Sequence, residues 1–266
     1  MKNQNLFYRD WGTGQPVVFA HGWALNSDMW QYQMVALPNV RRIAYDRLGH
    51  GRSADPGCGY DLDTLADDLA GLIERLDLHD AVLVGHSMGC AEIVRYLTRH
   101  GSSRVSRIAL VAPSLPFILK TPDNPHGVDA EILQAIRDMF RHDFPKWLGE
   151  NARPFFRPET SPEMVEWGIR LCLQTSLQAI VECNISDTET DLRPDLQRIS
   201  VPTLIIHGDN DASAPLDFTA RRVQSLVRGS VLKVYEGAPH GLFITHADRL
   251  NRDLAEFVAN PVAVAA

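Results

Sequence analysis

The chain has 266 residues, of which 45% are hydrophobic and 22% are charged, with a formal net charge of −7. This composition is that of a globular protein and excludes a collagen-like, low-complexity or disordered chain. The acidic balance, without any Lys/Arg cluster, argues against nucleic acid or anionic lipid as a partner. No stretch reaches the roughly 20 apolar residues that span a bilayer, and the first ten residues lack the apolar run of a signal peptide. We therefore expect a cytoplasmic protein that does not bind membranes.

Four cysteines are spread along the chain and match no metal-ligand spacing: Cys58, Cys90, Cys172 and Cys183. Their separation is typical of free thiols in a reducing compartment rather than of a disulfide framework. Since the sequence offers no other metal-binding constellation, we expect neither a metal nor a cofactor.

The first half of the chain alternates short apolar runs with amphipathic stretches. Helices are predicted at 62–78, where apolar residues recur every three or four positions, and at 88–100. Runs rich in β-branched residues predict buried strands at 17–20, 43–45, 81–84 and 108–112. This alternation predicts an α/β fold with a mostly parallel, doubly wound sheet.

The alternation stops after Ala112, where a proline-containing stretch leads into a helical and aromatic segment. Strand character returns at 203–207 and at 231–235. The simplest interpretation is a helical insertion between two strands of one sheet. The expected division is a core domain of 1–114 and 191–266 with a helical cap of 115–190.

A candidate nucleophile lies between the predicted strand 81–84 and the helix that follows, where the chain reads GHSMG. Gly85 and Gly89 stand two residues before and two residues after Ser87, where side chains would crowd a sharp strand-to-helix turn. Such a turn lifts a serine hydroxyl above the sheet and is the known nucleophile elbow of serine hydrolases. Ser87 is therefore the predicted nucleophile.

A serine nucleophile needs a base and a group that orients the base. Of ten histidines, His240 stands out because it lies in a tight GAPHG loop directly after a predicted strand. Two acids compete in the GDND loop after the preceding strand. Asp209 falls in the turn itself, where aspartate often binds its own backbone. We favour Asp211, which lies further out, and keep Asp209 as the alternative.

Two backbone N–H groups are candidates for an oxyanion hole. One belongs to Met88, directly after the nucleophile, and the other to Trp23, in the loop after the first buried strand. The neighbouring His21 is interpreted as a structural residue that bonds backbone. The Gly-rich segment 46–53 lacks the Lys-Ser/Thr ending of a phosphate-binding loop, so we interpret it as structural as well.

With these motifs placed, the chain resembles the cofactor-free (non-haem) haloperoxidases, or perhydrolases, and the bacterial aryl esterases of the α/β-hydrolase superfamily. The similar segments are 21–23, 28–34, 60–69, 91–104, 190–195, 201–209 and 238–241. The resemblance implies an α/β-hydrolase fold, a Ser87, Asp211 and His240 triad, oxyanion donors at Trp23 and Met88, and no cofactor. Departures from the family's pattern are His86 where Phe is common, Cys90 where Gly is common, and Ala24 in the oxyanion loop.

The chemistry expected is hydrolysis of small to medium carboxylic esters through an acyl-enzyme, with perhydrolysis as a side activity. A lactonase, a carbon–carbon bond hydrolase and a slow-turnover ligand receptor use the same triad and stay open as alternatives. Dehalogenases and epoxide hydrolases of this fold are excluded because they carry a carboxylate at the position of Ser87. The sequence leaves homo-oligomerisation open.

The expected substrate pocket combines the oxyanion loop with residues near the base and with cap aromatics. Its predicted lining residues are Leu242, Phe117, Phe144 and Trp147. An apolar pocket of modest size would favour small to medium acyl or aryl groups. The alternative is that the cap aromatics only pack the helices of the cap.

Overall fold

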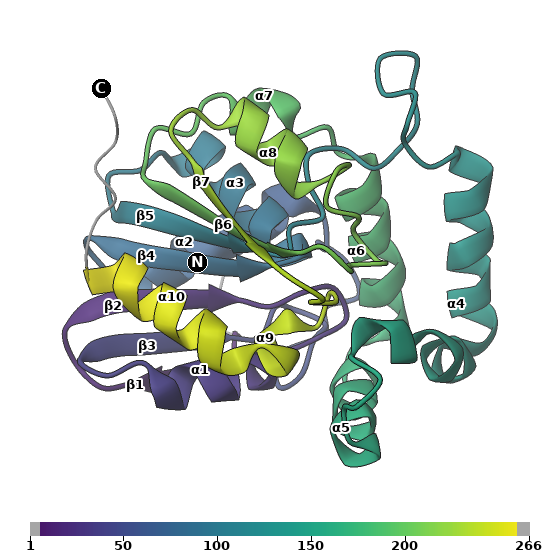
Figure 1. Ribbon diagram of the computed structural model, residues 1–266, viewed down its shortest axis with the longest axis horizontal. Coiled ribbons are helices and arrows are strands. Elements are labelled where there is room, and N and C mark those ends of the chain that lie inside the picture. Colours follow the sequence, from purple (N-terminus) through teal and green to yellow (C-terminus); the bar gives the residue numbers. More distant parts are fainter. Residues whose placement is uncertain (1–5, 260–266) are drawn as a thin grey trace.

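A seven-stranded sheet forms the centre of the computed structural model, which describes residues 6–259 (Figure 1). The strands are β1 (Tyr8–Trp11), β2 (Gln15–Ala20), β3 (Val40–Tyr45), β4 (Ala81–His86), β5 (Val105–Val111), β6 (Thr203–Gly208) and β7 (Val231–Tyr235). Their order is β1-β3-β2-β4-β5-β6-β7, with β1 antiparallel to β3 and the other neighbouring pairs parallel. The predicted α/β fold with a mostly parallel sheet is confirmed.

β1, the antiparallel edge strand, is not among the strands predicted from the apolar runs of the sequence. Its four residues read YRDW, and two of them are exposed, so the segment lacks the continuous apolar run of an internal strand. Tyr8 lies opposite Tyr45 of β3, and Trp11 lies opposite Arg42. Within residues 6–259, only one side of β1 has a neighbouring strand, which is why polar residues are tolerated there.

Helices cover both faces of the sheet, because successive strand residues point to opposite sides. Leu83 and Ile108 face a cluster that includes the helices α2 (Leu62–Arg75), α3 (Met88–His100), α7 (Arg193–Leu196) and α8 (Ala220–Leu226). Val82 and Val84 face a second cluster, built by η1 (Ser27–Trp30), α1 (Gln31–Ala36), α9 (Leu242–Thr245) and α10 (Ala247–Ala259). The strands are thus buried on both faces, as continuous apolar runs predict.

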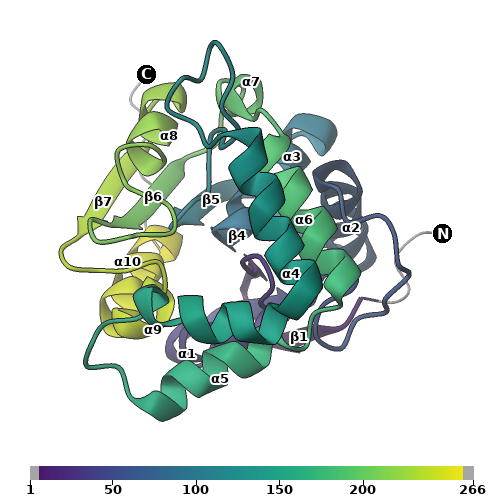
Figure 2. The ribbon, with the colours of Figure 1, turned by 90° about the vertical axis from the view of Figure 1, so that its right-hand side faces the viewer.

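The chain leaves the sheet between β5 and β6 and forms a helical layer over one end of it. This layer contains α4 (Ala130–Asn151), η2 (Arg153–Phe155), α5 (Pro162–Cys172) and α6 (Leu177–Glu189). Figure 2 looks onto this end and shows α4 and α6 side by side, beyond the carboxyl ends of the strands. A kink at Asp143, two residues before Pro145, bends α4. The division into a core and a cap at residues 115 and 190 stays a prediction, and we call residues 115–190 the cap.

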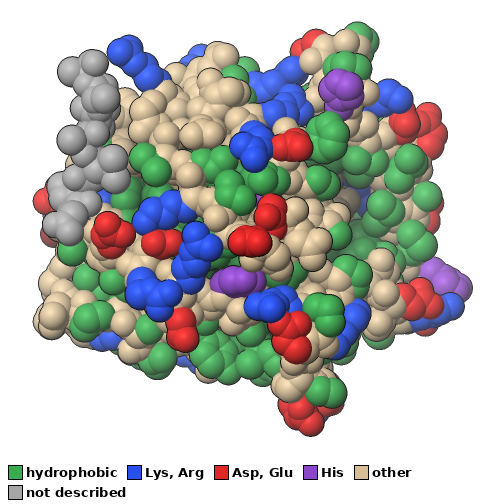
Figure 3. Space-filling model, viewed as in Figure 1, with side chains coloured by type: hydrophobic (Ala, Val, Ile, Leu, Met, Phe, Trp, Pro, Cys, Tyr) green, Lys and Arg blue, Asp and Glu red, His purple; other side chains and the backbone are tan. Residues whose placement is uncertain are grey.

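The face of the molecule seen in Figure 3 carries acidic and basic side chains interspersed with one another. Within residues 6–259, none of the helices combines the length and the apolarity that crossing a membrane requires. The expectation about a signal peptide concerns the first ten residues, and residues 1–5 lie outside the part of the chain that the structure describes.

Candidate active site

Ser87 lies at the sharp turn between β4 and α3, with backbone angles φ +52° and ψ −120°. Positive φ is unfavourable for a residue with a side chain, so the surroundings must enforce it. Gly85 and Gly89 make the turn feasible. A Cβ on Gly85 would lie 2.6 Å from the backbone of Gly89, and one on Gly89 would lie 2.4 Å from the carbonyl oxygen of Ala20. The two glycines are therefore required by the close approach of the backbone.

Ser87, His240 and Asp211 form a continuous chain of hydrogen bonds. The Oγ of Ser87 and the Nε2 of His240 are 3.0 Å apart, and the Nδ1 of His240 is 2.6 Å from Oδ2 of Asp211. All three side chains are buried. His240 follows β7, Asp211 follows β6 and Ser87 follows β4, so the three groups meet at the carboxyl end of the sheet.

Asp209, the alternative acid, has a different position. Its Oδ1 accepts a hydrogen bond from the backbone N–H of Gly237 at 2.6 Å, which braces the loop that leads to His240. Asp211 accepts hydrogen bonds from the backbone N–H groups of Ser213 at 2.9 Å and Ala214 at 2.8 Å. The geometry therefore brings Asp211, and not Asp209, to the imidazole.

The charge of Asp211 is stabilised by its neighbours. Burial alone would raise the pKa of this carboxyl, but His240 and His207 lie beside it and donate hydrogen bonds to it. Their effect outweighs burial and holds the pKa of Asp211 well below its usual range. An ionised carboxylate at this place can stabilise an imidazolium on His240.

The two predicted oxyanion donors belong to Met88, the residue after Ser87, and to Trp23. The structure pairs neither the backbone N–H of Trp23 nor that of Met88 with an acceptor among the described residues. Met88 begins α3, whose N-terminus favours negative charge. Trp23 lines the same cavity as Ser87, and its indole Nε1–H donates to the carbonyl oxygen of Ile180 in α6 at 2.8 Å. Both N–H groups therefore stay candidates for binding an anionic oxygen.

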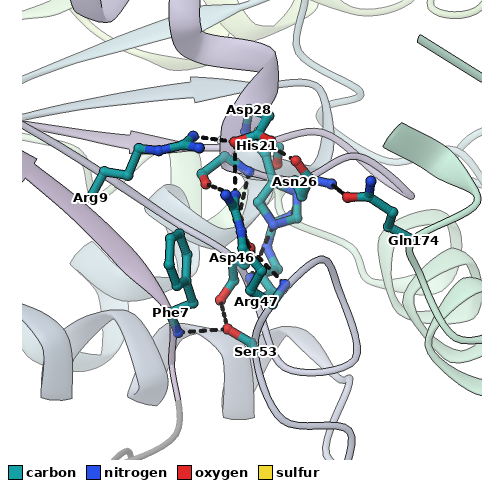
Figure 4. A network of polar contacts seen from close by, with 11 residues as sticks. Phe7, Arg9, His21, Asn26, Asp28, Asp46, Arg47, Ser53 and Gln174 are labelled. Atoms are coloured by element: carbon teal, nitrogen blue, oxygen red, sulfur yellow. Dashed lines mark hydrogen bonds and ion pairs between the residues drawn. The ribbon is translucent and has the colours of Figure 1, made fainter. Parts of the chain in front are cut away.

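A buried polar network supports the oxyanion loop (Figure 4). The Nε2 of His21 accepts from the backbone N–H of Arg47 at 3.1 Å, and its Nδ1–H donates to the carbonyl oxygen of Gly22 at 2.9 Å. Burial, followed by the charge of Arg47, lowers the pKa of His21 well below its ordinary value. Arg47 also donates to the carbonyl oxygen of His21 and pairs with Glu92 of α3, and both members of this ion pair are buried. His21 thus bonds backbone and lies outside the contact chain of Ser87.

The segment 46–53 packs against the loop 21–23 through Arg47, which bonds both the ring and the backbone of His21. Asp46 accepts from the backbone N–H groups of Ser27 and Arg52, each at 2.8 Å. The same region reaches the cap, because Asn26 donates to the side chain of Gln174 at 2.8 Å (Figure 4). These contacts fit the structural interpretation of the segment.

A cavity of about 360 Å³ opens beside Ser87 and His240. Its walls come from the oxyanion loop, the strand ends and the cap helices, and most of them are apolar or aromatic. Trp147 of α4, one of the expected pocket residues, is among the side chains that line it. The aromatic residues that complete the walls are Trp23, Phe155, Phe156, Trp167 and Phe243.

Three predicted lining residues lie elsewhere. Phe117 is buried under the guanidinium of Arg193, whose Cζ is 5.3 Å from the ring centroid. Phe144 packs inside the aromatic cluster of the cap. Leu242 is fully buried in the core cluster of α9 and α10, while its neighbour Phe243 lines the cavity instead. The structure places none of the three in the cavity wall. For Phe144 and Leu242 the rotation of the helix decides which side chain faces the cavity, whereas Phe117 lies in the loop between β5 and α4.

The family model described as "Alpha/beta hydrolase family" matches residues 17–253. The chain belongs to the alpha/beta hydrolase family. It is 42% identical over 262 residues to a putative non-heme chloroperoxidase of Synechocystis, covering 96% of this chain and 95% of that protein. It is 35% identical to a bifunctional esterase/perhydrolase of Acinetobacter calcoaceticus, covering 96% of each chain. The crystal structure of a bromoperoxidase from Bacillus anthracis superposes with a TM-score of 0.93 at 34% identity, covering 96% and 95%. The resemblance inferred from the sequence is confirmed.

Sequence reasoning missed two polar side chains of this alpha/beta hydrolase site. His207, the penultimate residue of β6, places its Nε2 3.3 Å from Oδ2 of Asp211 and 2.7 Å from the carbonyl oxygen of Ala214. Its place at the end of a buried strand, four residues before Asp211, is a signal that could have been used. Asp187 of α6 lines the cavity and accepts from the hydroxyl of Ser114 at 3.0 Å. No local motif marks Asp187, since its position depends on how the cap packs.

Proposed function

We propose that this chain is a serine hydrolase that cleaves small to medium carboxylic esters through an acyl-enzyme, with Ser87 as nucleophile, His240 as general base and Asp211 as the orienting acid. The observation that supports the proposal best is the pair of contacts around His240. One ring nitrogen lies 3.0 Å from Ser87 Oγ, and the other lies 2.6 Å from Asp211. Activation of a serine hydroxyl requires this arrangement.

In the proposed reaction, Ser87 Oγ attacks the ester carbonyl while its proton passes to Nε2 of His240. The N–H groups of Trp23 and Met88 stabilise the oxyanion. Collapse of the tetrahedral intermediate breaks the bond to the alcohol oxygen, which takes the proton from His240. Water then attacks the acyl-enzyme, again with His240 as base, and releases the acid and free Ser87.

Hydrogen peroxide in place of water gives the perhydrolase reaction. Its oxygen attacks the acyl carbon, His240 takes the proton, and the products are a peracid and free Ser87. The peracid then oxidises halide in solution, so the protein supplies only the acyl transfer. Support for this branch comes from the 35% identical relative, which is named as a bifunctional esterase/perhydrolase.

The variant Ser87→Ala tests both branches. We expect it to lose hydrolysis of p-nitrophenyl acetate by about 10³-fold or more, because the nucleophile is removed. Peroxide-dependent bromination in acetate buffer should be lost with it, and wild-type activity should survive a chelator. The exposed Ser225 provides a matched control, since Ser225→Ala should keep both activities. Full ester hydrolysis by Ser87→Ala would contradict the proposal, as would a wild-type preference for lactones over all esters in a substrate panel.

A further inference from the structure

Asp187 is the one acidic side chain among the cavity-lining residues of the described chain. It lies on α6, and the cavity that it lines also contains the apolar side chains Ile118, Val128, Leu133 and Ile136. The same cavity contains Ser87 and His240, so a substrate bound at the nucleophile shares its surroundings with this carboxyl. The catalytic steps proposed above give Asp187 no role.

Only one of the two oxygens of the Asp187 carboxyl has a hydrogen-bond partner among the described residues. Oδ1 accepts a hydrogen bond from Ser114 Oγ at 3.0 Å, whereas the structure records no partner for Oδ2 among the described residues. No Lys or Arg in the described chain forms an ion pair with Asp187. By contrast, the buried Asp195 of α7 pairs with Arg95 at 3.0 Å. A carboxyl oxygen beside a cavity is therefore available to a ligand.

The raised pKa of Asp187 shows that its surroundings disfavour the ionised carboxylate. Burial raises the pKa of Asp187 to about 7, although the hydrogen bond from Ser114 opposes the rise. His240 and Arg47 are the charged or titratable groups that act on it, and both also lower its pKa. A carboxyl held in apolar surroundings without a cation destabilises the fold, and such groups are typical of functional sites.

Two further polar side chains of α6 line the cavity beside Asp187. Asn184 and Thr188 line the cavity three residues before and one residue after Asp187. Arg137 of α4 donates to Oδ1 of Asn184 at 2.9 Å and to Oγ1 of Thr188 at 2.6 Å, and it pairs with Glu189 at 2.6 Å. Arg137 thus holds the side chains of Asn184 and Thr188 in place. Its ion pair is with Glu189 and not with Asp187, so Asp187 has no cationic partner among the described residues.

We propose that Asp187 is the recognition group for a hydrogen-bond donor on the substrate, so that the preferred esters carry a hydroxyl or amino group remote from the reacting carbonyl. The apolar walls bind the body of such a substrate, and Oδ2 of Asp187 accepts its O–H or N–H. Esters that carry a carboxylate at that place are disfavoured, because they would bring like charges together in apolar surroundings. This inference rests on the proposed ester hydrolase function.

Two series of esters test the inference, one for each side of the ester bond. The first contains phenyl acetates with a methyl, hydroxymethyl or aminomethyl group in the para position. The second contains methyl esters of phenylacetic acid with the same three substituents. Hydrolysis is followed in a pH-stat at about pH 8, where Asp187 is ionised in the wild type. The readout is the ratio of kcat/KM for each donor-bearing ester to kcat/KM for its methyl counterpart.

In the wild type, we expect at least one donor-bearing ester to exceed its methyl counterpart by about 10-fold, because a hydrogen bond to a carboxylate is charge-assisted. Asp187→Leu should reduce this ratio to one or below. Asp187→Asn should remove a preference for the aminomethyl ester and keep part of a preference for the hydroxymethyl ester. This difference tells whether the recognised donor is cationic or neutral. Glu182→Gln, which removes a carboxylate from the same helix outside the cavity wall, should leave the ratios unchanged.

Ratios near one in both wild-type series would overturn the inference, and so would an unchanged ratio in Asp187→Leu. If the leucine variant does not fold, the asparagine variant still gives the result. Failure of the proposed function looks different, because the wild type would then hydrolyse neither the methyl-substituted esters nor p-nitrophenyl acetate.

Discussion

His86 donates a hydrogen bond from its Nε2 to the backbone carbonyl oxygen of His240 at 3.0 Å. The residue just before the proposed nucleophile therefore holds the loop that carries the proposed base. The two imidazole centroids are 4.8 Å apart. Burial lowers the pKa of His86 to about 3, and the nearby His240 adds to this effect, so the side chain stays neutral beside a protonated base.

Replacing His86 with Phe should lower ester turnover and change the response to acid. The loss of one hydrogen bond frees the His240 loop, and we expect kcat to fall by about 10-fold. In the unfolded chain His86 has its ordinary pKa of about 6.5, so below that pH the unfolded state takes up a proton that the folded state refuses until about pH 3. The contribution of His86 to stability is therefore present above pH 6.5 and is lost as the pH falls.

The phenylalanine variant has no such loss. Between about pH 7.5 and about pH 5, its free energy of unfolding relative to the wild type should rise by about 2 kcal/mol. Urea denaturation at the two pH values measures this difference. An unchanged difference would mean that His86 is not held neutral by burial.

The pair Asp211→Asn and Asp209→Asn separates the two candidate acids. Asp211→Asn removes the charge 2.6 Å from Nδ1 of His240, and we expect kcat to fall by about 10³- to 10⁴-fold. Asp209→Asn keeps an oxygen for the N–H of Gly237 and should cost less than about 10-fold. Steady-state kinetics with p-nitrophenyl acetate decides between them. Collapse of the Asp209 variant alone would move the role of orienting acid to Asp209.

Glu92→Gln should destabilise the protein strongly. The substitution leaves Arg47 buried without its anionic partner, and breaking a buried ion pair costs about 3–5 kcal/mol. Since Arg47 also bonds the carbonyl oxygen of His21, we expect the remaining folded enzyme to show a reduced kcat as well. Thermal and urea unfolding measure the first effect. Glu189→Gln is the control, because the side chain of Glu189 is 42% exposed and its pair with Arg137 should contribute less than about 1 kcal/mol.

Asp187 should make stability fall as the pH rises. The unfolded carboxyl ionises near its ordinary pKa of 3.8, whereas the folded one keeps its proton until about pH 7. Between these values the folded state binds more protons, so stability decreases with rising pH and levels off above about 7. Asp187→Asn removes this titration. The free energy of unfolding of the Asp187→Asn variant minus that of the wild type should therefore be about 2 kcal/mol larger at about pH 7 than at about pH 5. Urea denaturation at the two pH values measures this difference. A flat difference would show that the carboxyl ionises freely in the folded state.

The fold and the sharp turn at the proposed nucleophile could be predicted because their signals are local. Apolar runs determine the buried strands, and two glycines around Ser87 determine the turn. The GDND loop contains two carboxylates only two residues apart, so the sequence could favour Asp211 but not exclude Asp209. Asp187 gave no signal at all. Its place in the cavity depends on the rotation of α6, which is determined by contacts such as those of Arg137 with residues far away in sequence.

Trp23 connects the loop after β2 with the cap. Its backbone lies in the oxyanion loop, while its indole bonds the carbonyl oxygen of Ile180 in the cap and lies 5.0 Å from the ring of Phe140. Any displacement of the cap would therefore also move the backbone N–H that we propose as an oxyanion donor. We therefore expect the position of the cap to control both the entry of the ester and the placement of the proposed oxyanion donor. With the cap displaced, an ester could enter the site but would not be cleaved. Differences in cap sequence among relatives would then alter the turnover number together with substrate affinity.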